Sequence, residues 1–255
     1  MSNLDLTFSD VYAQVGDYLG LGNPPTGTNL TLVQNIIYRA YRQLLCAVHP
    51  STGKQHIWSW LKKRYVLITE QDKWQYNMPS DFDKVIGQPI YGVNNPNPPL
   101  IRVPHEHILQ VRSVTTTQSF PTVYSVVHTS SDPDTGSLWE MWVWPQPNQK
   151  YPIHFQYVSS PEKPTATTNL FPGGMRVAEC ILQLSMAIAE QQKEGIFGIQ
   201  SQLADKLMSE LIVSDDIDTP ETVGAFEIFN PRGFKHYGVA SVYATDQADP
   251  ILCIC

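Results

Sequence analysis

The sequence predicts a mixed α+β protein in which helices from both ends of the chain form one helical bundle, with an antiparallel β domain inserted between them. Apolar residues recur with the helical period of about 3.6 over residues 7–48 and again over 173–213. Between these stretches, short runs rich in β-branched and aromatic residues alternate in the manner of strands. The expected division is a bundle from 1–64 and 170–216, a β domain over 65–169 and a C-terminal arm over 217–255.

The first two helices have local start and stop signals. The first is predicted to begin after Thr7, whose hydroxyl and the Asp10 carboxylate have the spacing of a capping box, and to stop at Gly20. The second is predicted to run from a Thr31 cap to about Val48, with apolar side chains on one face. Each helix therefore offers an apolar face for packing.

The middle of the chain has five runs that predict strands. They cover residues 65–69, 73–77, 122–128, 138–144 and 153–158. In the run 138–144, Trp142 and Trp144 are expected on one face and Trp139 on the other. Tryptophans on strands usually bury their large area in a sandwich core, so this segment is interpreted as a packed β domain.

The helical period returns after Pro172. It breaks near Gly195 and resumes to about Val213, which predicts two helices that pack on the N-terminal pair. Residues 216–255 do not fit the bundle, because Pro220 follows an acidic stretch and the chain ends in six uncharged, apolar residues. An apolar end needs a surface to lie against, so we expect an arm that docks on a neighbour or on its own subunit.

Charge is unevenly distributed along the chain, whose formal net charge is −7. No acidic residue occurs between Asp17 and Glu70, whereas residues 215–255 have a net charge of −5. Opposite charge at the two ends suits a subunit that meets unlike neighbours, and the overall sign disfavours nucleic-acid binding. The candidate partner-binding residues are Arg39, Arg42, Lys62, Lys63, Val239, Val242, Tyr243, Ile251, Leu252 and Ile254.

The sequence contains no catalytic motif of the nucleophile-elbow, P-loop or dinucleotide-binding kind. His105 and His107 are expected to share a strand face, and Cys253 and Cys255 are similarly spaced, but neither pair has a matching second half at zinc spacing. We therefore expect a non-enzyme with no catalytic, metal or cofactor site. No run approaches the roughly 18 apolar residues that would span a membrane, so no membrane partner is expected.

A series of short elements resembles one family. In order, it consists of Trp60-Leu61 with Arg64, the strand 65–69, Trp74-Gln-Tyr-Asn-Met-Pro-Ser-Asp-Phe82, Val143-Trp-Pro-Gln-Pro147, Ile153–Val158 with Ser160-Pro161, Leu170-Phe-Pro172 and the helix end Leu207–Asp216. Together these elements span about residues 5–216. The series resembles the head-to-tail connector adaptor proteins of tailed bacteriophages, which include the tail tubular protein A-like adaptors. Each element is short, so the resemblance is specific only through the order of the series. The loop 94–99 and the tail 217–255 depart from the family pattern.

The resemblance implies a structural role in the virion. Such adaptors form a ring, typically of twelve copies, beneath the portal protein, and they dock a nozzle, tube or other tail protein below. Genomic DNA passes through the lumen of the ring without sequence-specific binding. The expected location is the head–tail connector, assembled in the cytoplasm of the bacterial host.

Two other functions stay open at the level of sequence. A β-sandwich carbohydrate-binding or host-recognition module would expose Trp139, Trp142, Trp144 and Tyr157 as a stacking surface. A hydrolase would use Asp81 or Glu106 for acid–base chemistry, although nothing in the sequence pairs these carboxylates. Buried tryptophans would favour the adaptor, and exposed tryptophans would favour the carbohydrate-binding module.

Overall fold

The computed structural model describes residues 4–92, 95, 97–132 and 136–218, and it has the mixed α+β class that the sequence predicted. The helices are α1 (Phe8–Leu19), α2 (Gly27–Leu45), α3 (His105–Val114), α4 (Met175–Glu194) and α5 (Ile199–Asp218). The strands are β1 (Lys62–Ile68), β2 (Gln75–Asn77), β3 (Phe82–Tyr91), β4 (Ile101–Arg102), β5 (Gln118–Ser119), β6 (Val123–Asp132), β7 (Gly136–Trp144), β8 (Gln146–Pro147) and β9 (Pro152–Ser159).

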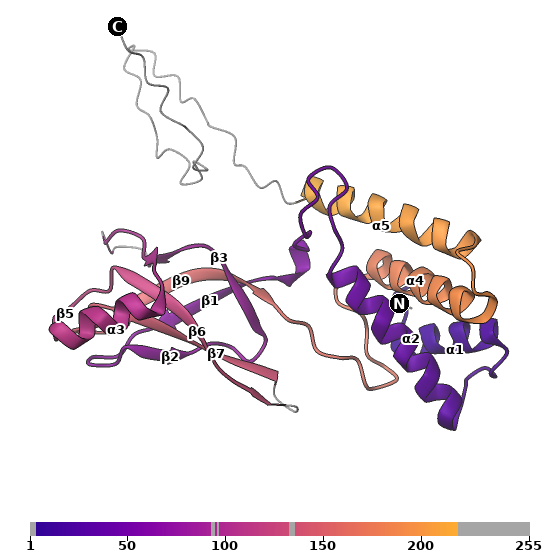
Figure 1. The fold of residues 1–255 in the computed structure, drawn as a ribbon, viewed down its shortest axis with the longest axis horizontal. Helices are drawn as coiled ribbons and strands as arrows, with labels where there is room; N and C mark the ends of the chain where they lie inside the picture. Colours follow the sequence, from indigo (N-terminus) through magenta and orange to yellow (C-terminus); the bar gives the residue numbers. More distant parts are fainter. Residues whose placement is uncertain (1–3, 93–94, 96, 133–135, 219–255) are drawn as a thin grey trace, which may run out of the picture.

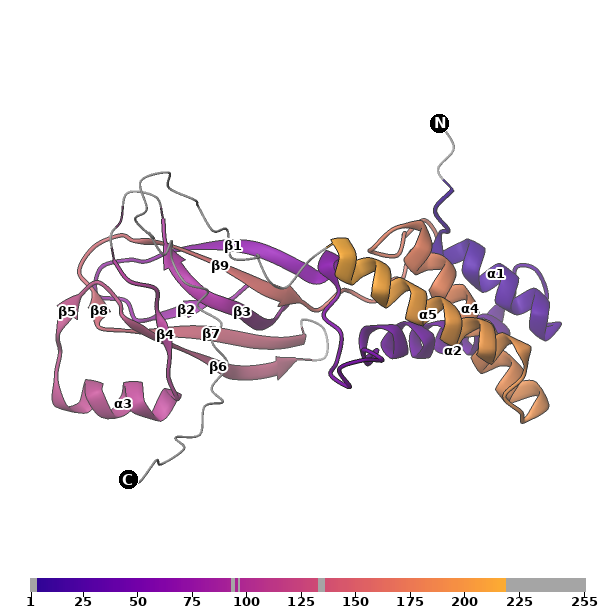
Figure 2. The ribbon, with the colours of Figure 1, turned by 90° about the horizontal axis from the view of Figure 1, so that it is seen from above.

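The molecule is elongated (Figures 1 and 2), with α1, α2, α4 and α5 at one end and the sheets with α3 at the other. Two segments of chain connect the ends: one leads from α2 to β1, the other from β9 to α4. No helix in the described ranges is both long and apolar enough to cross a lipid bilayer.

The start of α1 is confirmed, and the start of α2 is corrected. Thr7 Oγ1 accepts the Asp10 N–H at 3.2 Å, and the Asp10 carboxylate accepts the Thr7 N–H at 2.9 Å, which completes the capping box. In contrast, α2 begins one turn before Thr31, at Gly27. Thr31 lies inside the helix and directs its hydroxyl back toward the Gly27 carbonyl, an alternative to capping that its side chain allows.

Helices from both halves of the chain share one apolar core. Helix α4 packs against α1, α2 and α5, and α1 also packs against α2. The most deeply buried side chains of this core include Phe8, Ile37, Leu44, Ile181 and Ile212. These four helices therefore pack on one another through their buried apolar residues.

The strands form two main sheets with a second core between them. One sheet has the order β1-β9-β3 and is antiparallel throughout, and the other has the order β2-β7-β6-β4. Figure 2 shows them as separate layers. Buried residues of both layers belong to one cluster, which is rich in tyrosine and phenylalanine. The two sheets therefore pack face to face as a β-sandwich.

Three features of this region differ from the sequence prediction. His105 and His107 lie on helix α3 instead of a strand, because Pro104 precedes a first helical turn that contains Glu106. Residues two apart on a helix do not face each other, so the expected shared face does not exist. Strand β3 was not predicted, since Gly87 and a register shift between Ile86 and Ile90 interrupt its alternation. The short pairs β4–β6 and β5–β8 are parallel.

Candidate functional site: a histidine–aspartate clasp and the flanking surfaces

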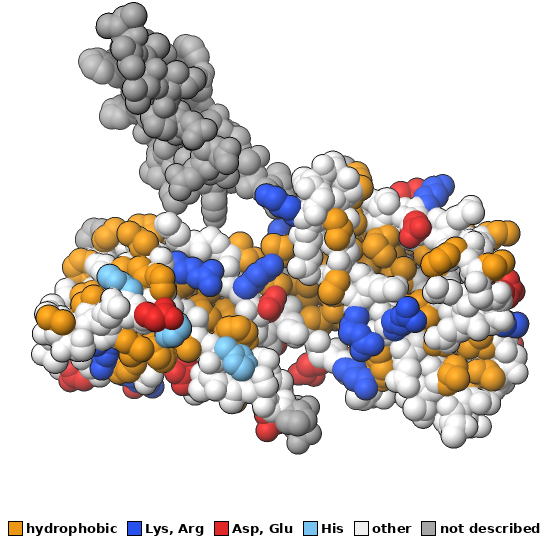
Figure 3. All heavy atoms as spheres, in the orientation of Figure 1, with side chains coloured by type: hydrophobic (Ala, Val, Ile, Leu, Met, Phe, Trp, Pro, Cys, Tyr) orange, Lys and Arg blue, Asp and Glu red, His pale blue; other side chains and the backbone are white. Residues whose placement is uncertain are grey.

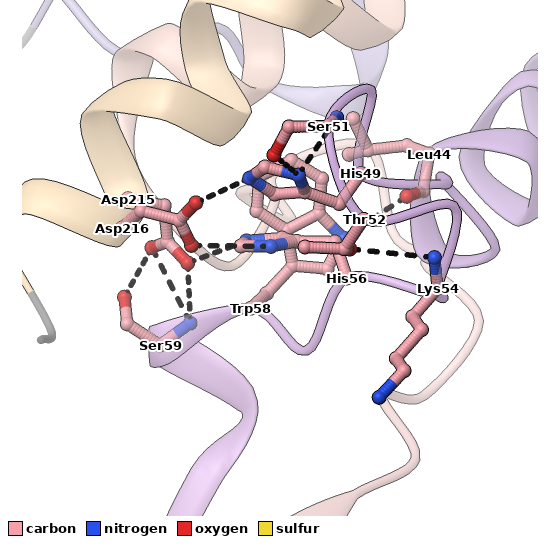
Figure 4. A network of polar contacts seen from close by, with 10 residues as sticks. All are labelled: Leu44, His49, Ser51, Thr52, Lys54, His56, Trp58, Ser59, Asp215 and Asp216. Carbon is pink, nitrogen blue, oxygen red and sulfur yellow. Dashed lines mark hydrogen bonds and ion pairs between the residues drawn. The ribbon is translucent and has the colours of Figure 1, made fainter. Parts of the chain in front are cut away.

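The most connected polar network joins the segment after α2 to the C-terminal end of α5 (Figure 4). Asp215 accepts hydrogen bonds from the Ser59 N–H at 2.9 Å and the Ser59 hydroxyl at 2.5 Å. The same carboxylate contacts His56 Nε2 at 2.8 Å. Both His56 and Asp215 are largely buried, with side chains 6% and 10% exposed. A buried carboxylate needs such partners, so this contact fixes the helix end against the segment.

A second histidine extends the network. His49 Nε2 lies 2.6 Å from Asp216 Oδ2, and His56 Nδ1 lies 3.5 Å from the other oxygen of the same carboxylate. The Ser51 N–H, which can only donate, points to His49 Nδ1 at 3.2 Å. The ring proton of a neutral His49 is therefore assigned to Nε2, which donates to Asp216. We call His49, His56, Ser59, Asp215 and Asp216 the clasp.

The clasp rests on a buried tryptophan. Trp58 is fully buried, and its indole N–H donates to the Leu44 carbonyl at 3.0 Å. The His56 ring packs edge-on against it, with ring centroids 4.5 Å apart. The clasp is thus connected to the last turn of α2 as well as to α5. It fixes the end of α2 and the segment that follows it against the end of α5, with 159 positions between His56 and Asp215.

The groups of the clasp are those of Ser–His–Asp chemistry, but their arrangement differs from a catalytic one. In a triad the imidazole nitrogen next to the serine must be free to take its proton. Here His49 Nδ1, the nitrogen nearest the Ser51 hydroxyl at 2.9 Å, also accepts the Ser51 backbone N–H. The Ser59 hydroxyl donates to Asp215 instead of facing His56. This geometry suits holding α5 against the segment after α2 better than it suits nucleophilic attack.

The sequence gives little warning of the clasp. His49 directly follows the predicted end of the second helix, Asp215 begins the acidic stretch 215–255, and 167 positions separate His49 from Asp216. The adjacent aspartates at the end of the last helix were the one visible signal. No spacing rule connects them to histidines so distant in the chain.

The corner at residues 78–82, which belongs to one of the resembling elements, forms a second polar site. Asp81 accepts a hydrogen bond from Lys63 Nζ at 2.6 Å and another from the Tyr157 hydroxyl at 2.9 Å. Burial opposes ionisation of Asp81, but these bonds outweigh it, and the pKa of the carboxyl lies below its usual value. Burial and the hydrogen bond to Asp81 raise the pKa of Tyr157 to about 12.

The two carboxylates considered for a hydrolase lie in different surroundings. Asp81, in the turn before β3, is held by Lys63 of β1 and Tyr157 of β9. Glu106 is exposed in the first turn of α3, with His105 Nε2 at 3.3 Å. Within the ranges that the structure describes, no three His, Cys, Asp or Glu side chains gather in a way that could hold a metal ion. Cys253 and Cys255 lie outside those ranges.

The tryptophans of the sandwich are buried or half-buried. Trp144 is buried, while Trp139 and Trp142 are half-buried. Trp142 lies edge-on to Trp74, at 4.9 Å between ring centroids, and donates its indole N–H to Glu140 at 3.0 Å. Tyr157, the fourth member of the proposed stacking surface, is buried on the other sheet. These rings do not form one open platform.

The basic residues among the candidate partner-binding residues lie on two elements, α2 and β1. Arg39 and Arg42 are exposed on α2, and Figure 3 shows Lys and Arg side chains gathered over this helix. Lys62 and Lys63 open β1, and Lys63 is already paired with Asp81. Six further candidates lie outside the described residues: Val239, Val242, Tyr243, Ile251, Leu252 and Ile254.

Comparison with known proteins does not assign the fold or the clasp to a family. A scan against protein-family models finds no match, and a search of the curated proteins finds no match either. Function is therefore inferred from the residues and their geometry.

Proposed function

We propose that this chain is a structural, non-enzymatic adaptor of a tailed bacteriophage, which forms a ring of twelve copies beneath the portal. The ring extends the channel through which the genomic DNA passes without sequence-specific binding, and it docks a nozzle, a tube or another tail protein below. Its place is the head–tail connector of the virion, after assembly in the host cytoplasm. The proposal begins from the ordered series of elements between residues 60 and 216.

One observation carries the proposal. Helices that precede and follow the sheets in sequence pack into one apolar core, while the sheets between them form a separate core. This supports a bundle built from both ends of the chain with an inserted β domain. The order of helices, sheets and helices agrees with the order of the resembling elements.

The distribution of charge supports contacts between unlike surfaces. Arg39 and Arg42 are exposed, and in the described part of the chain neither has an ion-pair partner. Residues 215–255, which include the proposed arm, have a net charge of −5. A closed ring requires heterologous contacts, in which one patch meets a different patch of the neighbour. A basic patch on α2 and an acidic segment elsewhere in the sequence are unlike groups of the kind that such a contact joins.

The test is assembly on the portal. Sedimentation of the purified chain should show mainly monomer, and mixing with the portal protein of the same phage should yield rings visible by electron microscopy. Arg39→Glu combined with Arg42→Glu should reduce ring formation, because it reverses the basic patch. Lys84→Glu with Lys150→Glu, an equal charge change at exposed positions of the sheet end, is the matched control. A wild-type chain that forms no complex with the portal contradicts the proposal.

The carbohydrate-binding alternative makes a different prediction about the same molecule. It needs tryptophans open to solvent, and none of the six is exposed. A glycan array with the wild-type chain separates the functions. Binding that Trp142→Ala abolishes would favour the alternative, and the adaptor function expects no binding.

A further inference from the structure

The two outer faces of the β-sandwich differ in what covers them. Helix α3 packs on β6 and β7, and its Arg112 guanidinium lies over the Trp74 ring, 3.7 Å from the ring centroid. Figure 2 shows α3 beside this layer and none of the described helices over the layer of β1, β9 and β3. Within the described ranges, the outer side of the β1-β9-β3 sheet is therefore uncovered, and we call it the open face.

The alternation of the strands shows which side chains point to the open face. Leu67 of β1 is buried in the sandwich core, so the residues on either side of it point outward. Four residues of β1 belong to this outward set: Lys62, Arg64, Val66 and Ile68. Val66 pairs with His154 of β9, which pairs with Ile90 of β3, and paired residues share a face.

The half of the open face that is farther from the helices is apolar. Val66 is 44% exposed, Ile68 59% and Ile90 51%. Val66 and Ile90 flank His154 on neighbouring strands, and Ile68 is the next outward residue after Val66, so the three form a contiguous group. We call these three residues the sheet patch. Single exposed apolar residues are ordinary, but a contiguous group marks an interaction surface.

The half of the open face that is nearer to the helices is basic. Lys62 lies opposite Val158, a member of the helical core, so this end of the face adjoins the bundle. Arg64 is exposed and Lys62 is half-buried. In the described part of the chain, neither has an ion-pair partner.

The remaining charges of β1 and β3, and the acid that follows β1, do not cancel these two. Each has a residue of opposite charge beside it: Lys63 is bonded to Asp81, Lys84 follows Asp83, and Glu70 pairs with Lys73. Lys62 and Arg64 therefore give the end of the open face next to the bundle a net positive charge.

Helix α5 ends at this basic end. Asp215 accepts the Ser59 N–H at 2.9 Å, and Ser59 lies three residues before the start of β1. Figures 1 and 2 both show α5 ending beside the start of β1. Asp215 and Asp216 are bonded to the histidines of the clasp, so any acid that meets Lys62 comes later in the chain. Residues 219–255 follow α5 directly and therefore begin next to the basic end.

These residues have chemistry that matches the open face in the same order. Glu221 and Glu227 come first, before the two basic residues of the segment. Residues 250–255, which are uncharged and apolar, follow two further acids. An extended chain covers about 3.3 Å per residue, so the roughly 20 Å from Lys62 to Ile68 is well within reach.

We propose that residues 219–255 dock on the open face of their own chain. Their acidic start lies beside Lys62 and Arg64, and residues 250–255 lie over the sheet patch. Because the segment begins at this face, tethering gives it an effective concentration on the order of millimolar, which favours the same chain over a neighbour. Under the proposed function, docking withholds the acidic start from neighbouring copies until assembly on the portal displaces it. Docking itself is a property of the free chain and does not depend on that function.

Disulfide formation within the full-length free chain tests the docking. Cys46 and Cys255 are replaced by serine, which leaves Cys253 as the reactive thiol, since the remaining cysteine is buried. Ile68→Cys is then compared with Ile101→Cys on β4, because both isoleucines are 59% exposed. In dilute protein with oxidised glutathione, the intrachain bond to position 68 should form about tenfold faster than the bond to position 101, because docking holds Cys253 over the sheet patch. Mass spectrometry of the digested chain identifies each bond.

Charge variants of the Ile68→Cys chain test the basic end. Lys62→Glu with Arg64→Glu should remove most of the rate advantage, because both new carboxylates repel the acidic start of the segment. Arg39→Glu with Arg42→Glu makes the same charge change on α2 and should leave the advantage unchanged. Circular dichroism shows whether each variant is folded.

A third variant applies the same test from the segment and leaves the sheet unchanged. Glu221→Gln with Glu227→Gln removes the acids that meet the basic end, so the rate advantage at position 68 should fall by several fold. An advantage that survives this change and the reversal on β1 overturns the proposed orientation of the segment.

The other outcomes separate the docking from the proposed function. Equal rates at positions 68 and 101, or disulfides mainly between chains, overturn the docking even if rings form on the portal. A rate advantage at position 68 in a chain that does not bind the portal upholds the docking and overturns the adaptor function.

Discussion

The helical core and the sandwich core are built from different kinds of side chain. The helical core is mainly aliphatic, and its most connected polar network, the clasp, lies at its edge. In the sandwich core, seven of thirteen buried members are Phe or Tyr, and five of these are tyrosines whose hydroxyls need partners inside the protein. Tyr76 donates to the Lys73 carbonyl at 2.7 Å, and Tyr151 to Asn148 at 2.7 Å.

This difference predicts different sensitivities. An aliphatic core loses stability mainly when volume is removed, because a cavity is left behind. A core with polar handles also loses stability when a single hydrogen bond is broken at constant volume. The substitutions below separate these effects.

The largest effect is expected from truncation in the helical core. Leu44→Ala should lower the free energy of unfolding by about 2–5 kcal/mol, because its fully buried side chain packs among helices from both ends of the chain. Leu184→Ala tests the partner helix in the same way. Denaturant unfolding measures both, and Leu32→Ala at an exposed position of α2 is the control. Losses near zero at both buried positions would mean that this core does not hold the two chain ends together.

The helical core was the part most accessible to sequence reasoning. Its helices are set by local signals, such as the Thr7–Asp10 capping box and the glycines that stop α1 and α4. The misplaced start of α2 shows the limit of such signals, because Thr31 has the right chemistry for a cap but occupies an internal turn. A side chain that can cap does so only where the backbone leaves the helix.

The sandwich was less predictable for a physical reason. Strands with clean alternation, such as β7, were recognised, whereas β3 was missed because its bulge breaks the period of two. Strand partners and the clasp depend on residues far apart in sequence, and no local pattern encodes that pairing. The exposed side chains of Ile196, Phe197 and Ile199, between α4 and α5, are visible in the sequence only as apolar residues near Gly195, where helix and turn cannot be told apart.

The next largest effect is expected at the clasp. Asp215→Ala should cost about 1–3 kcal/mol of unfolding free energy, because it leaves the buried His56 ring and the Ser59 donors without their acceptor. Asp216→Ala should cost less, since that carboxylate is 44% exposed and solvent can replace it. Chemical denaturation of both variants gives the comparison. Equal losses would show that burial does not set the strength of the clasp.

A smaller, pH-dependent effect is expected at the corner of the sandwich. Asp81→Asn should cost about 1–2 kcal/mol at neutral pH, since it removes the charge that Lys63 and Tyr157 recognise. The folded-state pKa of Asp81 lies below its unfolded value, so its contribution is complete above about pH 4 and is lost as the pH falls further. Unfolding curves of both proteins should therefore converge in acid. A difference that stays constant down to the acid limit would assign the loss to packing instead of charge.

The smallest effect separates a true cap from a residue that only has the composition of one. Thr7→Ala should lower the free energy of unfolding by about 1 kcal/mol, because it removes the acceptor of the Asp10 N–H and opens the reciprocal bond of the capping box. The low pKa of Asp10 has the same cause, its hydrogen bonds to Thr7, and should rise toward the usual value in this variant.

Thr31→Ala is the matched control: it changes the same residue type on the neighbouring helix, but at an exposed internal position with only a long contact to the Gly27 carbonyl. Its effect should stay within about 0.5 kcal/mol of zero, since alanine is also the better helix former. Thermal unfolding of the two variants and NMR titration of Asp10 measure these differences. Equal destabilisation by both substitutions would mean that the Thr7–Asp10 exchange adds nothing beyond the intrinsic preference of threonine.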